Sequence, residues 1–247
     1  MINLIKPNWS APSHINAFST TRLGGVSKGP YLGLNLGLHV EDEPSLVLQN
    51  RKLLTQQLGL ISPLCWLNQT HSTLLLKLDK QTEQGIEADA SWTTEKGLTC
   101  VVMTADCLPV LITNKQGTFV LAIHAGWRGL CDGIIEKTVR FICSELNQQS
   151  SELLVWLGPC IGKRAFEVGS EVRDEFINHD ADAKQAFTVF QDRYLANLHL
   201  LARLRLAEFN VAEITASEHC TFSEPDLFYS YRRDGNTGRM ATLISIA

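Results

Sequence analysis

Residues 119–129 read FVLAIHAGWRG. The stretch opens on a continuous apolar run, which is typical of a β-strand whose two faces are both covered. His124 stands at the end of this run, and two glycines, a tryptophan and an arginine follow it closely. His124 is therefore either a core residue with a satisfied hydrogen bond or a functional group that the strand delivers to a site.

Similar apolar runs predict the rest of the fold. We expect strands at 64–68, 73–78, 98–103, 108–113, 118–124, 153–157, 212–217 and 240–246. Amphipathic periodicity predicts helices over 43–59, 132–147 and 194–209, with a shorter helix over 169–178. Because strands buried on both faces need covering layers, the predicted fold class is α/β, an α+β layered sandwich with central β-sheets between helical layers.

Some details of these elements are also predicted. Asp42 is the expected N-cap of the first helix, and Gly59 is its expected stop. The strands at 98–103, 108–113 and 118–124 are joined by short links, which predicts an antiparallel meander. Because internal repeats, low-complexity segments and linkers are absent from the sequence, we expect one domain over residues 1–247.

Composition limits the classes of function. The chain has 247 residues, 45% of them apolar and 19% charged, as in an ordinary globular protein. Its net charge of -4 gives no electrostatic reason to expect nucleic acid or an anionic membrane surface as a partner. Seven cysteines at irregular spacings argue against a disulfide framework. With no signal peptide and no apolar stretch of about 18 residues, we expect a cytoplasmic protein.

Three segments carry residues that could bind a soft or borderline metal: NQTHS with His71, TADCLPV with Cys107, and AIHAGWRG with His124. In an antiparallel pair joined by a tight turn, the start of the first strand meets the end of the second, which would bring Cys107 beside His124. Two imidazoles and one thiolate would suit Zn²⁺ and leave a fourth position open, the catalytic pattern. Taken singly, each residue also fits a structural role in the core.

Other polar residues are candidates for substrate binding. The loop over residues 20–37 is rich in glycine, and its amides could embrace an anion or ribose hydroxyls. Asp89 and Asp106 lie beside the segments that carry the proposed ligands. Arg128 could hold an anion or stack on Trp127. The segment YRRDGNTGR adds three more arginines, which are Arg232, Arg233 and Arg239.

The order of motifs resembles one family. The motifs are TxRxGGVSxGPYxxLNLGxHV at 20–40, NQTHS at 68–72, ADA at 88–90, TADCLPVLI at 104–112, AIHAGWRG at 122–129, LGPCIG at 157–162, FEVGSEV at 166–172 and FYSYRRDGNTGRMA at 228–241. They are similar to those of the YfiH-like group, which comprises proteins named polyphenol oxidases or laccase-domain proteins, purine nucleoside phosphorylases and the bacterial peptidoglycan editing factor. The resemblance runs from about residue 17 to the last residue.

The resemblance implies a Zn²⁺ site made by His71, Cys107 and His124, with copper as a possible substitute. It implies sheets between helical layers and a distant fold relation to the cytotoxic necrotizing factor cysteine hydrolases. The implied activities are phosphorolysis of purine nucleosides, including methylthioadenosine, and deamination of adenosine. The editing branch implies instead hydrolysis of UDP-muramoyl precursors that bear L-Ser. The implied partners are small molecules, nucleosides and phosphate, with no obligate protein partner.

Roles can be assigned as hypotheses. In deamination, zinc would activate water for attack on C6 of adenine, with Asp89 as the first candidate for the proton shuttle and Asp106 as the second. In phosphorolysis, Arg22 and Arg233 would position phosphate while Asn35 binds a hydroxyl or the base. Copper-dependent polyphenol oxidation, an amidase with Cys107 as nucleophile and His124 as base, and a non-enzymatic binding protein are the alternatives.

Overall fold

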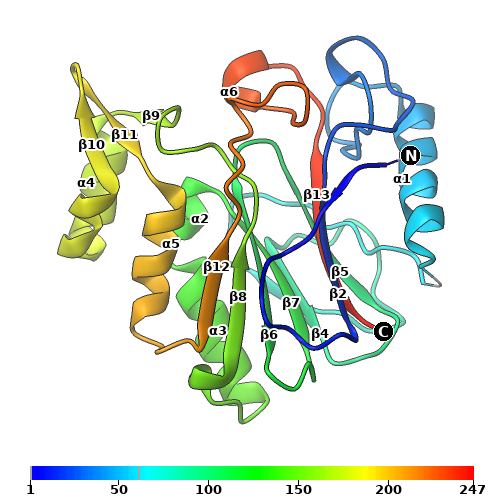
Figure 1. The fold of residues 1–247 in the computed structure, drawn as a ribbon, viewed down its shortest axis with the longest axis horizontal. Helices are drawn as coiled ribbons and strands as arrows, with labels where there is room; N and C mark the ends of the chain where they lie inside the picture. The colour runs from blue at the N-terminus through cyan, green and yellow to red at the C-terminus, as the bar shows by residue number, and fades with distance from the viewer. Residues whose placement is uncertain (1, 61) are drawn as a thin grey trace.

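Two stacked β-sheets occupy the centre of the computed structural model, which describes residues 2–60 and 62–247 (Figure 1). The four-stranded sheet runs in the order β1 (Leu4–Ile5), β2 (Ile15–Thr20), β13 (Met240–Ile246) and β5 (Thr99–Thr104), all antiparallel. The six-stranded sheet runs in the order β12 (Glu213–Ala216), β8 (Leu153–Leu157), β6 (Leu108–Asn114), β7 (Val120–Ala125), β4 (Ala90–Thr93) and β3 (Leu75–Lys77). Its two edge pairs are parallel and its inner pairs are antiparallel.

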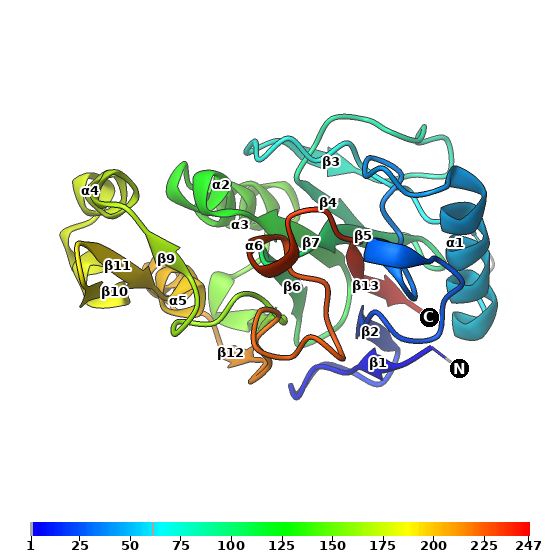
Figure 2. The same cartoon turned by 90° about the horizontal axis from the view of Figure 1, so that it is seen from above.

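Helices cover the outer face of each sheet. On the four-stranded sheet lies α1 (Pro44–Leu58), and on the six-stranded sheet lie α2 (Trp127–Cys131), α3 (Ile134–Glu145) and α5 (Leu198–Ala207), as Figure 2 shows from above. A three-stranded sheet in the order β10 (Phe187–Phe190), β11 (Arg193–Ala196) and β9 (Glu167–Val168) accompanies α4 (Ser170–His179) at one end of the molecule. The short elements are α6 (Tyr231–Asp234) and the 3₁₀ helices Gly29–Tyr31, Ser150–Glu152 and Ala181–Ala186.

The alternation of side chains along the central strands explains their continuous apolar sequences. On β5, Val102 packs between the two sheets while Val101 packs toward α1. On β6, Leu111 packs between the sheets while Ile112 packs toward the helices of the other side. Since successive residues point to opposite faces of a strand, burial on both faces requires apolar residues at every position. The predicted fold class is confirmed.

Most of the predicted elements are found, with three corrections. Residues 64–68 do not form a strand, because this segment makes a single isolated bridge, between Asn68 and Glu87. The N-cap of α1 is Glu43, while Asp42 turns toward Ser27 and Asn35. The predicted meander is wrong at its first link. Strand β5 pairs with β13 in the other sheet, and β6 pairs with β7 as expected.

Two further differences concern boundaries and missed strands. The helix predicted over 194–209 begins at Leu198, because residues 193–196 form β11. Strands β1, β2, β4, β9 and β10 were also not predicted, and most of them are short or mix polar with apolar residues. No described helix has both the length and the hydropathy that crossing a bilayer requires.

Candidate metal centre

Strand pairing brings two of the predicted ligands together. The register of β6 and β7 pairs Pro109 with His124, so Cys107, directly before β6, lies beside the end of β7. Along β7, Val120 and Ala122 pack between the two sheets, and His124 continues this face by alternation. His124 is buried, at 4% exposure. The strand therefore carries an imidazole to the end of the layer between the sheets.

His71 reaches the same place from a loop. Its backbone has a φ of 61°, in the left-handed region that non-glycine residues rarely adopt. Its Nε2 lies 3.8 Å from Sγ of Cys107, and its ring centroid lies 4.9 Å from that of His124. One ligand atom from each of the three residues falls within 4.8 Å of the other two. The three predicted metal ligands thus converge.

Asp89 holds both the loop and the buried histidine. Its Oδ1 accepts a 2.7 Å hydrogen bond from Nδ1 of His124 and a 3.1 Å bond from the backbone N–H of His71. Its Oδ2 accepts from the backbone N–H and hydroxyl of Ser72, at 2.7 and 2.8 Å, and from the N–H of Thr70 at 3.2 Å. The Asp89 side chain is fully buried. This carboxylate acts as the positioning group of the site.

The charge of Asp89 determines the tautomer of His124. Burial alone would raise the pKa of Asp89, but hydrogen bonds from His124 and Ser72 outweigh it and lower the pKa below its ordinary value. An ionised carboxylate only accepts hydrogen bonds, so Nδ1 of His124 donates. The lone pair of Nε2 is then available to a metal, an arrangement typical of metal-binding histidines.

Two glycines behind the strand make room for the ligands. A Cβ added at Gly126 would clash with the ring of His71, at 3.1 Å from its Nε2, and would lie 3.3 Å from Sγ of Cys107. A Cβ at Gly129 would approach the carbonyl oxygen of Ser72 to 3.0 Å. These two glycines therefore allow the backbone to approach the three residues closely.

The thiol and the buried imidazole perturb each other. Burial raises the pKa of Cys107, but the neighbouring His124 and His71 more than offset it and lower the pKa to about 6. Burial likewise lowers the pKa of His124, but Cys107 and Asp89 more than offset it and raise the pKa to about 9. Near neutral pH and without a bound metal, the two groups therefore form a thiolate–imidazolium pair, and a metal that binds Nε2 of His124 must displace the proton from that nitrogen. A thiolate is the form of cysteine that binds metals.

The donor set fits a single metal ion. With Zn–N distances of about 2.1 Å and Zn–S distances of about 2.3 Å, tetrahedral ligands lie roughly 3.5 Å apart. The distance of 3.8 Å between Nε2 of His71 and Sγ of Cys107 matches this separation. The three ligand atoms lie within 4.8 Å of one another, so small side-chain shifts would bring all of them into tetrahedral positions. Two imidazoles and one thiolate suit zinc or copper. The site could therefore hold a metal.

A cavity of about 540 Å³ opens over these residues. Its wall combines apolar and aromatic side chains, namely Ile161, Phe166, Leu198 and Trp127, with three arginines, Arg128, Arg232 and Arg239. A cavity of this size and mixed lining is typical of a small-molecule site.

The arginines differ in what they can do. Arg128 is exposed at the cavity, and its guanidinium stacks on Trp127 at 4.4 Å. Nη1 of Arg239 donates to two backbone carbonyls, those of Thr237 and Gly238. Nη1 of Arg232 donates to the carbonyl of Glu167. Arg128 is therefore the lining arginine that can turn most freely toward an anion.

Three other predicted substrate-binding residues lie outside this cavity lining. The guanidinium of Arg22 donates to the carbonyls of Leu32 and Pro225, and that of Arg233 donates to backbone carbonyls including Phe228. Asn35 is fully buried. Its Oδ1 accepts hydrogen bonds from the backbone N–H groups of Gly37 and Arg239, and its Nδ2 donates to the carboxylate of Asp42. These contacts hold the glycine-rich loop and the C-terminal segment in place, and substrate binding by these residues stays a prediction.

Asp106, the weaker candidate for proton transfer, is also engaged. Its backbone φ is 95°, and its side chain is buried. Its carboxylate accepts from the hydroxyls of Thr221 and Ser230 and from the N–H of Arg232, at 2.6, 2.9 and 2.7 Å. Asp106 therefore ties the turn before Cys107 to the C-terminal segment.

His39 was not predicted as a site residue. It lines the cavity with an exposed side chain, and partial removal from water, followed by the charges of Arg239 and Arg51, lowers its pKa below the ordinary value. It is therefore neutral near pH 7 and can accept a hydrogen bond. Its motif, LNLGxHV, was part of the family resemblance, but spacing along the chain gave no sign that it faces the metal ligands.

Comparison with known proteins adds to this geometry. Residues 16–247 match the family described as "Multi-copper polyphenol oxidoreductase laccase". The chain is 50% identical over 244 residues to "Purine nucleoside phosphorylase YfiH" of Escherichia coli K12, covering 99% of each chain. It is 47% identical over 243 residues to a purine nucleoside phosphorylase of Haemophilus influenzae, covering 97% of this chain and 98% of that one.

Solved structures show the same fold. A Neisseria meningitidis protein superposes with a TM-score of 0.93 at 43% identity, covering 99% of both chains. YlmD from Geobacillus stearothermophilus superposes with a TM-score of 0.89 at 29% identity, covering 99% of this chain and 98% of that one. The chain is similar to these proteins over nearly its whole length.

Proposed function

The chain belongs to the YfiH-like laccase-domain family, and from this premise we propose that it is a zinc-dependent purine nucleoside phosphorylase. The observation that carries the proposal is the convergence of His71, Cys107 and His124 at the base of a cavity that is large enough for a nucleoside. Relatives with 50% and 47% identity bear the name purine nucleoside phosphorylase.

Zinc is proposed on the chemistry of the donor set. Three protein ligands with an open fourth position are typical of catalytic zinc. A multicopper centre needs many histidines, whereas the chain has seven histidines and the described residues contain one three-ligand group. A single copper ion at the same ligands is the alternative. When bound, the zinc ion supplies Lewis-acid polarisation of an oxygen in the cavity.

The chain's own residues bind and orient the reactants. In phosphorolysis a phosphate oxygen forms a bond to C1′ of the ribose while the bond from C1′ to the purine nitrogen breaks. The guanidinium of Arg128 is exposed at the cavity and can pair with phosphate through two N–H groups. The aromatic and apolar wall, with Trp127 and Phe166, can hold the purine. The proposal thus assigns phosphate first to Arg128, while phosphate binding by Arg22 and Arg233 stays a prediction.

The finer activities use the same cavity. We include phosphorolysis of methylthioadenosine and deamination of adenosine. Deamination needs a proton donor to the leaving ammonia. Asp89, the predicted donor, already accepts five hydrogen bonds and positions His124. Proton transfer by Asp89 would therefore require these bonds to rearrange.

One assay tests the proposal. Protein of measured metal content, and its His124→Ala variant, are incubated with adenosine with and without phosphate, and products are identified by mass spectrometry. Adenine and ribose 1-phosphate should form only with phosphate, inosine should form without it, and the variant should form neither. If zinc-loaded wild-type protein gives no product, the proposal is wrong, and hydrolysis of UDP-muramoyl precursors becomes the leading candidate.

A matched pair of arginine variants tests the phosphate assignment. Arg128→Ala should raise the KM for phosphate by roughly tenfold or more, since a hydrogen bond to a charged group contributes about 1.5–3 kcal/mol. Arg233→Ala should lower thermal stability, because its guanidinium holds the carbonyls of Thr221, Phe222 and Phe228. Equal KM values for phosphate in wild type and Arg128→Ala would contradict the assignment.

A further inference from the structure

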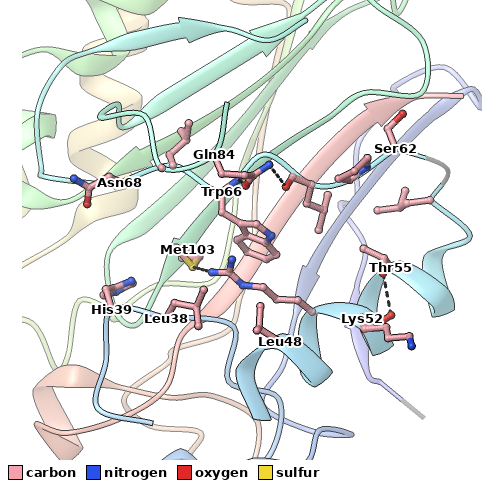
Figure 3. Close-up of a pocket in the computed structure, with 16 residues that line it drawn as sticks. Leu38, His39, Leu48, Lys52, Thr55, Ser62, Trp66, Asn68, Gln84 and Met103 are labelled. Carbon is pink, nitrogen blue, oxygen red and sulfur yellow. Dashed lines mark hydrogen bonds between the residues drawn. The ribbon is translucent and has the colours of Figure 1, made fainter. Parts of the chain in front are cut away.

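Figure 3 shows the residues that line a groove of about 950 Å³, which adjoins the metal cavity. It runs between α1 and the segment that carries Trp66 and Asn68, and Gln84 lies along the same wall. The groove and the metal cavity share two lining residues, His39 and Met103. The two spaces are therefore neighbours that share part of their lining.

In the middle of the groove wall, an arginine stacks on an aromatic ring. The guanidinium of Arg51 lies 3.9 Å from the ring centroid of Trp66. Its Nε and Nη2 donate to the carbonyl of Leu36 at 2.9 and 2.8 Å, and Nη2 also contacts Sδ of Met103 at 3.9 Å. These contacts fix a positive, planar group in the groove wall. Its Nη1 makes none of these bonds.

The rest of the lining is apolar, polar without charge, or positively charged. Leu48 and Leu38 are 56% and 43% exposed, so both present apolar surface to the groove. Lys52 adds a second positive charge from α1. None of the described residues that line the groove is acidic, although the whole chain has a net charge of -4. The groove is thus a positive, partly apolar site on an acidic protein.

We propose that this groove is a second binding site, for a small organic anion with a planar or apolar body. The exposed leucines and the edge of Trp66 would contact the body of the ligand, and Arg51 and Lys52 would face its carboxylate, sulfonate or phosphate. The metal cavity alone already has a volume typical of a drug-sized ligand, so a nucleoside leaves the groove free. Charge complementarity, together with the absence of acidic lining, selects an anion over a neutral ligand.

The proposal does not depend on the reaction at the metal. The side chains that carry it, Leu48, Lys52 and Trp66, belong to the groove and are not part of the metal cavity lining. Variants at Leu48 and Lys52 should therefore change binding in the groove and leave adenosine turnover unchanged. This separates failure of the groove proposal from failure of the proposed enzyme activity.

Binding of two fluorescent probes tests the proposal. The anionic probe is 1-anilinonaphthalene-8-sulfonate, and the neutral probe is N-phenyl-1-naphthylamine, which has the same aromatic body without the sulfonate. The folded protein should bind the anion at one saturable site and at least about threefold more tightly than the neutral amine. Lys52→Glu, which turns an attraction into a repulsion, and Leu48→Asp, which adds an anion to the wall, should each weaken sulfonate binding by about threefold or more.

Two control variants locate the probe. Lys96→Glu makes the same charge change at an exposed residue outside the groove lining and should leave the affinity unchanged. Arg128→Ala alters the metal cavity and should also leave it unchanged. The proposal is overturned if the neutral amine binds as tightly as the sulfonate, if Lys52→Glu and Lys96→Glu weaken binding equally, or if binding does not saturate.

Discussion

Replacing Asp89 with asparagine tests the way the metal centre is built. Asparagine keeps the shape of the side chain but has one accepting oxygen, and its other end donates. If the amide oxygen faces the loop, the NH₂ group faces His124, whose Nδ1 must then give up its proton. The proton moves to Nε2, the nitrogen that should bind the metal. If the oxygen faces His124 instead, the N–H groups of Thr70 and Ser72 lose their acceptor.

The expected magnitude follows from these hydrogen bonds. Each buried donor left without a partner costs about 1–3 kcal/mol, so one or two of them should lower the free energy of unfolding by roughly 3 kcal/mol. Loss of a partner that orients a metal-binding histidine typically lowers metal affinity by about 10–100-fold. Both effects are expected in Asp89→Asn because its side chain is fully buried.

Two measurements check this expectation. The Kd for zinc is obtained by competition with a chromophoric chelator, and the free energy of unfolding of metal-free protein is obtained from urea titration. Asp226→Asn makes the same chemical change at an exposed position and serves as the control. An Asp89→Asn protein with the wild-type Kd for zinc would refute the assignment of Asp89 as the positioning group, whatever its stability.

Three further predictions concern the thiol, a glycine and the glycine-rich loop. In metal-free protein the rate of Cys107 alkylation by iodoacetamide should rise with pH through about 6, because the lowered pKa of the thiol yields thiolate above that pH. One equivalent of zinc should suppress the alkylation. A midpoint near 8.5, the ordinary pKa of cysteine, would contradict the lowered pKa of Cys107. Gly126→Ala should weaken zinc binding at least about tenfold, because the added Cβ would press on the ring of His71. Gly97 has a φ of +79° and open space around it, so Gly97→Ala should lower stability and leave zinc binding unchanged. Asn50→Ala should lower the free energy of unfolding by about 2–4 kcal/mol, because the buried side-chain amide of Asn50 hydrogen-bonds to Val26, Ser27, Gly33 and Asn35. Urea titration measures this loss. A loss under about 1 kcal/mol would show that these hydrogen bonds do not hold the glycine-rich loop.

Sequence patterns predicted the layers of the fold but not the pairing of its strands. A run such as VVMT in β5 is apolar on both faces, which correctly indicates a strand between two covering layers. The same run gives no preference for a partner, and β5 pairs with β13, which lies far away in the chain. The segment 64–68 reads as a strand, but its apolar residues are buried without a ladder. Burial explains such a sequence as well as strand pairing does.

Only the part of the site that depends on neighbouring strands could be predicted from the sequence. Cys107 and His124 lie on consecutive antiparallel strands, so local spacing alone indicates that they meet. His71 and His39 come from loops, and only the fold brings them to the cavity. The neighbours Arg232 and Arg233 look alike in sequence, yet Arg232 lines the cavity while Arg233 bonds backbone carbonyls. Which of two adjacent side chains faces a cavity depends on the short helix α6 and its packing.

The burial of Asp89 indicates why strand β7 carries a histidine near its end. Removing a carboxylate from water costs several kcal/mol unless its oxygens are satisfied, and an apolar residue of similar size would avoid that cost. Asp89 recovers the cost through five donors, of which one is His124 and the others fix the loop that carries His71. A single buried charge therefore orients one predicted metal ligand directly and positions another through the backbone. A histidine with a purely structural role would need one hydrogen bond, and the additional bonds to the loop favour the proposed metal centre.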